Sequence, residues 1–189
     1  MLMTQLEIYE ANVREKARSK TDYLFHNEGN DHALIICENI FKTAESHIRI
    51  AANQLYNDQV VNTPRYIEAM KFFLDKSNTK LDIIITNAPA REDVQKEGTL
   101  YGMIYDHSAY KEGRIRIKVG EGKSFRNDAG EMVNFCTGDN RIFRFEDDIE
   151  NRTAIANFNE PKTTQELILE FDKVFGILVK PLNLDDYFS

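Results

Sequence analysis

The sequence of 189 residues contains only two cysteines, Cys37 and Cys136, and no Cys-x-x-Cys pair. Two cysteines cannot build a disulfide framework, and such sparse use fits a reducing compartment. The longest apolar runs, such as residues 81–86, have the length of a strand, which excludes a transmembrane helix. Residues 1–20 also lack the apolar core of a secretory signal. We therefore expect a cytoplasmic protein that does not associate with membranes.

Histidine is scarce as well. The four histidines are His26, His32, His47 and His107, and no two of them stand four residues apart. Zinc sites on helices use that spacing, and zinc sites in loops use paired cysteines, so neither pattern is present. The sequence predicts no metal site and no cofactor.

What the chain does contain is enough apolar surface for a core. Hydrophobic residues make up 42% and aromatic residues 11% of the sequence, which excludes an intrinsically disordered chain. The length suits a single domain. The net charge is −7, so the chain as a whole repels a polyanion such as nucleic acid. We expect a helical lead-in over residues 1–21, one domain over residues 22–180 and a tail over residues 181–189.

Hydrophobic periodicity indicates alternating helices and strands. Spacings of three and four predict helices, and strict alternation or short β-branched runs predict strands. The expected helices cover residues 4–20, 31–46, 63–77, 92–110 and a last segment that starts at 161 and ends before Pro181. The expected strands cover residues 47–52, 81–86, 114–119, 132–137, 141–146 and 153–158. This order predicts an α/β fold, with a mixed sheet flanked by helices on both faces.

The order of elements and two segments carry a family resemblance. The first segment is the hairpin Met-Val-Asn-Phe-Cys-Thr-Gly-Asp at 132–139 followed by Arg-Ile-Phe-Arg-Phe-Glu at 141–146. The second is Ala-Ile-Ala-Asn-Phe-Asn-Glu-Pro at 154–161, which leads into a helix with Phe171 and Asp172 near its end. Over most of residues 22–178 the chain resembles the phospholipase D-like fold. The resemblance rests on element order and implies a single half of a two-half catalytic site.

In that family the chemistry uses the pattern His-x-Lys-x4-Asp. Aligning Asp139 with the family aspartate puts Met132 at the histidine position and Asn134 at the lysine position. Methionine cannot attack phosphorus, and asparagine cannot supply the charge that neutralises phosphate oxygens. The resemblance therefore implies a degenerate site without a catalytic residue, in a chain that pairs with itself or with a related protein subunit.

Two further groups of residues are candidates for binding. Along one expected strand, apolar residues alternate with Arg114, Arg116 and Lys118. These basic side chains either contact phosphates or lie in solvent and keep an exposed sheet edge from pairing with another strand. The last helix and the tail carry more apolar side chains than one core needs, which predicts an interface patch and a homodimer. The interface candidates are Phe171, Phe175, Leu184, Tyr187 and Phe188.

These observations predict a non-catalytic phospholipase D-like binding or regulatory module. The resemblance implies a place in a bacterial nucleic-acid-handling or anti-phage defence assembly. The net charge of −7 predicts that any binding to nucleic acid is weak. One alternative is a metal-dependent nuclease or phosphodiesterase that uses His32, His47 or His107 with the acidic residues of segment 146–150. The other alternative is a scaffold protein that binds through its C-terminal tail, where Leu182 and Leu184 are expected to be exposed.

Overall fold

A single mixed sheet organises the computed structural model, which describes residues 2–56, 59–122 and 125–189. Its strands follow the order β1-β7-β6-β5-β2-β3-β4. Their bounds are β1 Phe25–Asn27, β2 His47–Ala52, β3 Lys80–Ile85, β4 Ile115–Val119, β5 Asn134–Gly138, β6 Ile142–Asp148 and β7 Thr153–Asn157. Strands β2, β3 and β4 pair in parallel, and every other neighbour pair is antiparallel.

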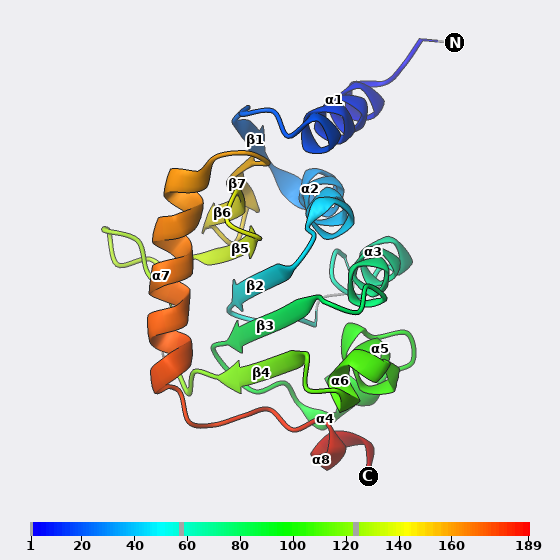
Figure 1. Cartoon of the computed structure of the whole chain (residues 1–189), viewed down its shortest axis with the longest axis vertical. Helices are drawn as coiled ribbons and strands as arrows, with labels where there is room; N and C mark the ends of the chain where they lie inside the picture. The colour runs from blue at the N-terminus through cyan, green and yellow to red at the C-terminus, as the bar shows by residue number, and fades with distance from the viewer. Residues whose placement is uncertain (1, 57–58, 123–124) are drawn as a thin grey trace.

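Helices cover both faces of this sheet (Figure 1). One face carries α7, and the other carries α2, α3 and the short helices α4 to α6. The bounds are α1 Gln5–Ser19, α2 Gly29–Thr43, α3 Pro64–Leu74, α4 Arg91–Gln95, α5 Leu100–Asp106, α6 Ser108–Lys111, α7 Pro161–Ile177 and α8 Asp185–Phe188. The expected mixed α/β sandwich is confirmed. None of the described helices combines the length and the apolar character that crossing a bilayer requires.

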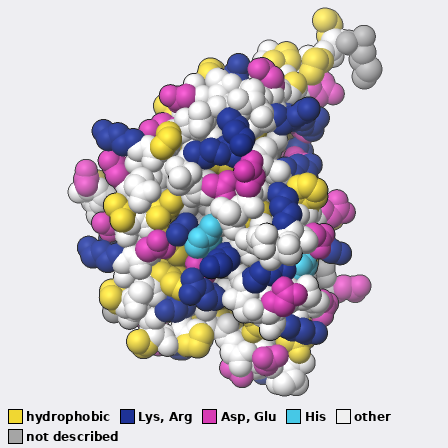
Figure 2. Space-filling model, viewed as in Figure 1, with side chains coloured by type: hydrophobic (Ala, Val, Ile, Leu, Met, Phe, Trp, Pro, Cys, Tyr) yellow, Lys and Arg dark blue, Asp and Glu magenta, His cyan; other side chains and the backbone are white. Residues whose placement is uncertain are grey.

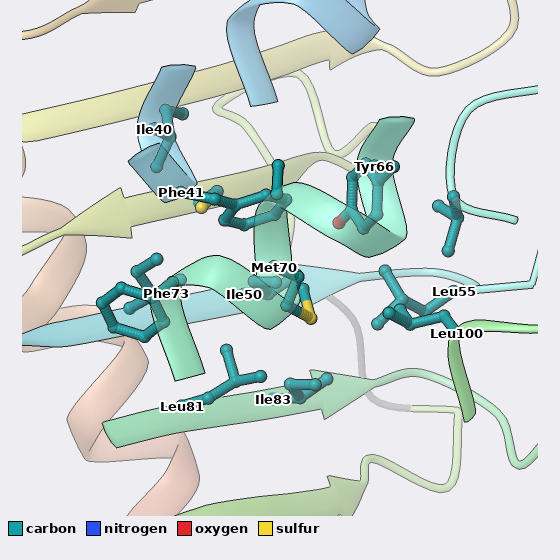
Figure 3. Packing of buried hydrophobic residues seen from close by; sticks show 14 of the residues in the cluster. Ile40, Phe41, Ile50, Leu55, Tyr66, Met70, Phe73, Leu81, Ile83 and Leu100 are labelled. Carbon is teal, nitrogen blue, oxygen red and sulfur yellow. The ribbon is translucent and has the colours of Figure 1, made fainter. Parts of the chain in front are cut away.

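The main core lies between the sheet and the α2–α3 layer. Figure 3 shows Leu81 and Ile83 of β3 below Met70 and Phe73 of α3, and Ile50 of β2 beside Met70. These side chains are at most 5% exposed. A T-shaped contact between Phe41 and Tyr66, with ring centroids 4.9 Å apart, joins α2 to α3. A second, smaller cluster under α7 contains Ala51, Ile84, Phe135, Phe171, Phe175 and Leu178.

Two local expectations differ from the structure. The single helix expected over residues 92–110 is instead three short helices, because Thr99 caps the start of α5 and His107 ends α5 and caps α6. Residues 25–27, where no strand was expected, form the edge strand β1 against β7. A three-residue strand has too little periodicity to be recognised in sequence, and its partner lies far along the chain.

The tail also differs from expectation. Leu182 and Leu184, expected to be exposed, are 6% and 0% exposed. The amide of Leu182 donates to Ile117 O at the edge of β4, and Phe188 stacks on Tyr105 with centroids 4.5 Å apart. The tail therefore folds back onto β4 and the α4–α6 layer.

Candidate functional site

A small cavity opens where β5 begins, on the face of the sheet covered by α2 and α3. Its volume is about 60 Å³. The described residues that line it come from α2, β2, the following loop, α3, β5, β6 and the turn before β7; they are Ala33, Cys37, Phe41, Ile50, Ala51, Ala52, Gln54, Leu55, Val60, Val61, Tyr66, Asn134, Phe135, Cys136, Arg144, Glu146 and Arg152. Of the three positions of the degenerate pattern, only Asn134 lines this cavity.

The strand register explains which polar groups reach the cavity. Asn134 pairs with Glu146 and Cys136 pairs with Arg144 across β5 and β6. Successive side chains of a strand point to opposite faces, so these two cross-strand pairs share the α2 face. The residue between them, Phe135, packs against Phe171 on the α7 face. Pairing of β5 with β6 thus places a carboxylate, a guanidinium, an amide and a thiol side by side.

A buried hydrogen-bond network joins these groups. The Glu146 side chain is 1% exposed; its Oε1 accepts from Arg144 Nη2 at 2.8 Å and its Oε2 accepts from Asn134 Nδ2 at 2.7 Å. Arg152 Nη1 lies 3.7 Å from Glu146 Oε1. The amide of Asn53 donates to Asn134 Oδ1 at 2.8 Å. Asn134 is therefore held on both of its amide atoms.

The two cysteines line the cavity as thiols. Both are free, and burial raises the pKa of each. A thiol with a raised pKa stays protonated at neutral pH and is a poor nucleophile. The cavity therefore does not offer an activated cysteine.

Met132 and Asp139 lie elsewhere. Met132 precedes β5, pairs with Arg126 in an isolated bridge and is 38% exposed, beside a surface hollow lined by Glu131, Asp147 and Asp148. Asp139 lies beyond the opposite end of β5 from Asn134. The three positions belong to one pattern in the sequence, but in the structure only Asn134 lines the cavity, and Met132 and Asp139 lie outside it.

Asp139 fastens the turn between α2 and β2. Its carboxylate accepts from the amides of Glu45, Ser46 and His47 at 2.8 to 3.2 Å and from the Ser46 hydroxyl at 2.8 Å. Burial opposes the charged form of Asp139, but these donors outweigh it and hold the pKa of Asp139 below its ordinary value. Asp139, the aspartate of the degenerate pattern, therefore stabilises the turn between α2 and β2.

The three basic candidates of the β4 segment all have partners within the chain. Arg114 donates to carbonyl oxygens of Leu74, Lys76 and Thr79 at 3.1 to 3.3 Å. Arg116 makes two hydrogen bonds of 2.7 Å to Asp82, and its side chain remains 57% exposed. Lys118 donates to Phe175 O and Leu178 O at the end of α7. Phosphate binding by these residues stays a prediction.

The interface candidates divide into two groups. Phe171, Phe175 and Leu184 are 0%, 7% and 0% exposed, within the chain's own core. Tyr187 and Phe188 are partly buried against that core. Because these five side chains are buried or partly buried within the chain itself, they do not form the exposed apolar patch expected from the sequence.

The histidines lie outside the cavity. His47 Nε2 is 2.9 Å from Asp82 Oδ2, His107 Nε2 is 3.2 Å from Asp75 Oδ1, and His32 stacks on Tyr9. Within residues 2–56, 59–122 and 125–189, no three His, Cys, Asp or Glu side chains converge as a metal site would require.

Comparison with known proteins gives the fold. No protein-family model matches the chain, and no curated protein matches its sequence. TrmBL2, an archaeal chromatin protein with a novel mode of DNA binding, has a similar structure, with a TM-score of 0.56 at 11% identity over 92% of this chain and 60% of that one. Nuc, a phospholipase D family member from Salmonella typhimurium, has a TM-score of 0.55 at 11% identity over 85% of this chain and 98% of that one.

The chain has a phospholipase D-like fold. At 11% identity these likenesses establish the fold alone. The chain spans 60% of the length of the archaeal chromatin protein. The signal that sequence reasoning missed is the cross-strand register, because Arg144 and Glu146 fall beside Cys136 and Asn134 only once β5 and β6 are paired.

Proposed function

We propose that the chain is a non-catalytic phospholipase D-like module that binds a ligand or a partner in a bacterial nucleic-acid-handling or anti-phage defence assembly. The observation that carries this proposal is the state of Asn134. It stands where the resemblance implies a lysine, and its amide is held by Glu146 and Asn53. A neutral side chain held in this way cannot neutralise a phosphoryl oxygen, and the described lining of the cavity contains no histidine. The two free thiols fit a cytoplasmic location.

A chromogenic phosphodiester such as bis(p-nitrophenyl) phosphate tests the absence of catalysis. We expect no turnover above the uncatalysed rate, with or without added Mg²⁺ or Mn²⁺. Asn134→Ala is the diagnostic variant, and Asn140→Ala is its control, because Asn140 is an exposed asparagine of the same hairpin. Turnover that Asn134→Ala abolishes and Asn140→Ala preserves would show that the cavity is catalytic and would overturn the proposal.

We further propose that the module works as a homodimer or beside a related subunit, as the resemblance implies. Light scattering at micromolar concentration decides this, because a monomer has a mass of 21.9 kDa and a dimer has twice that mass. Since Leu184 belongs to the chain's own core, Leu184→Ala is expected to lower stability without changing the mass. A mass of one chain at every concentration contradicts self-association.

A further inference from the structure

The C-terminal segment 180–188 connects the two faces of the sheet. Figure 1 shows the chain running from the end of α7, on one face, past the edge strand β4 to α8, which lies beside α4 on the other face. Leu178 is still buried under α7, and the carbonyl oxygen of Lys180 already accepts from the amide of Val119 in β4. Val179 lies between them and is 90% exposed. One exposed residue therefore links α7 to the segment.

The hydrogen bonds of this segment go to β4, to the loop after it and to the α4–α6 region. The amide of Leu182 donates to Ile117 O at 2.9 Å, and Arg91 of α4 donates to Tyr187 O at 3.1 Å. Within the described part of the chain, no hydrogen bond joins the segment to α7. The surface that receives the segment therefore does not require that the segment follow the α7 of the same chain.

The link also carries apolar side chains that remain in water. Ile177, the last residue of α7, is 65% exposed, and Val179 is 90% exposed. Leu182 and Leu184, which follow the link, are in contrast buried against the rest of the chain. Removing the two exposed side chains from water is favourable, but the fold of a single chain leaves them uncovered. A second copy of the chain can cover them at the link.

We propose that residues 180–188 are exchanged between two copies of this chain, so that each segment occupies the β4 edge and the α4–α6 surface of its partner. The inference rests on the proposed homodimer and names its interface. The contacts of the segment are the same in the closed monomer and in the exchanged dimer, so the dimer is favoured by what it adds at the link. There the two links pass each other, and Ile177 and Val179 of both copies cover one another. Short links are those that favour exchange.

An isotope-mixing experiment shows which chain supplies the segment. Lys180 Nζ lies 3.1 Å from Glu121 Oε1, and both side chains are exposed, so a carbodiimide can couple them directly. Unlabelled and isotope-labelled chains are mixed in denaturant, refolded together, coupled at micromolar concentration and digested for mass spectrometry. In an exchanged dimer, about half of the Glu121–Lys180 links should join a labelled to an unlabelled peptide, because the two populations pair at random. In a closed monomer, each link joins peptides of the same label.

The ion pair between Lys20 and Glu45 is the matched control. Lys20 Nζ lies 2.9 Å from Glu45 Oε1, both side chains are exposed, and neither residue belongs to the exchanged segment. We expect the links of this pair to stay within one label while those of Lys180 are mixed. Label mixing at Lys180 that is no greater than at Lys20 overturns the inference.

A substitution at the link tests what favours the exchange. Val179→Ser removes an apolar side chain that is exposed in the closed monomer, so the free energy of unfolding of the monomer should not change. The dissociation constant of the dimer should rise about tenfold or more, because two valine side chains leave the contact. Leu169→Ser is the control, because Leu169 is 61% exposed on α7 but lies about two turns before the link. Light scattering over a concentration series measures both variants.

The possible failures have different signatures. A mass of two chains with unmixed Glu121–Lys180 links means that the copies associate without exchange, so the inference is wrong and the proposed homodimer stands. A mass of one chain at every concentration overturns both. A dimer that Val179→Ser weakens no more than Leu169→Ser does overturns the contact at the link. The phosphodiester assay does not depend on any of these outcomes, so the non-catalytic proposal is tested separately.

Discussion

At the scale of single residues, Asp139 shows how a residue of a catalytic pattern can serve the fold. Its carboxylate accepts four hydrogen-bond donors of the turn before β2, and its backbone has a left-handed φ of 54°. Asparagine also tolerates the left-handed conformation. Asp139→Asn therefore removes the charge and one of the two acceptor oxygens without straining the backbone. We expect this substitution to lower the free energy of unfolding by about 1–3 kcal/mol at neutral pH. Chemical denaturation measures it, with the exposed Asp128→Asn as the control.

The same carboxylate makes stability depend on pH. The pKa of Asp139 is lowered in the folded state, so its contribution is complete above the unfolded value of about 4 and is lost as pH falls through the folded value. The wild-type protein should therefore lose more stability between about pH 5 and pH 2 than Asp139→Asn does. Parallel acid-unfolding curves for the two proteins would contradict this assignment.

Arg144 and Glu146 form the second test at this scale. Because both are buried, removal of Glu146 leaves the Arg144 guanidinium without its ion-pair partner. Glu146→Leu alone should destabilise the protein by about 3–5 kcal/mol, and adding Arg144→Met should recover part of that loss. A double-mutant cycle in urea measures the coupling. If the double variant is destabilised by the full sum of the single changes, the two side chains do not act as a pair.

At the scale of elements, a lysine of β4 holds the end of α7. Lys118 Nζ donates to Phe175 O at 2.7 Å and to Leu178 O at 2.8 Å, and it lies 4.5 Å from the centre of the Phe175 ring. Lys118→Met keeps the apolar stem and removes these bonds, so we expect a loss of about 1.5–3 kcal/mol. Lys162→Met, at the exposed start of α7, is the matched control. Equal stability of the two variants would contradict the capping role.

The same scale shows how far sequence predicts the fold. The alternation of Arg114, Arg116 and Lys118 with apolar residues predicted β4, since half-buried strands have period two. The segment that became α4, α5 and α6 was predicted as one helix, because its apolar spacing outweighed Gly98 and Gly102. Of the residues that line the candidate cavity, only Asn134 was named from the sequence as a site residue, as a position of the degenerate pattern. Arg144 and Glu146 are distant in sequence from Cys37 and Tyr66, and only tertiary packing brings them together.

At the scale of the whole molecule, net charge affects the expected affinity for nucleic acid. The chain has a net charge of −7, and on the face in Figure 2 basic side chains lie intermingled with acidic ones. Arg114, Arg116 and Lys118 are already bonded within the chain, so a phosphate would have to compete with Thr79, Asp82 and the end of α7. We therefore expect weak or no binding to generic duplex DNA at physiological salt.

Fluorescence anisotropy with a labelled duplex, at low and physiological salt, measures this directly. Any binding seen at low salt should weaken steeply as salt rises, because each phosphate contact releases condensed counterions. Arg116 has the most exposed of the three side chains, so Arg116→Glu should reduce such binding while Arg18→Glu serves as the exposed control. Submicromolar affinity at physiological salt that Arg116→Glu abolishes would instead make β4 a nucleic-acid contact, despite the acidity of the chain as a whole.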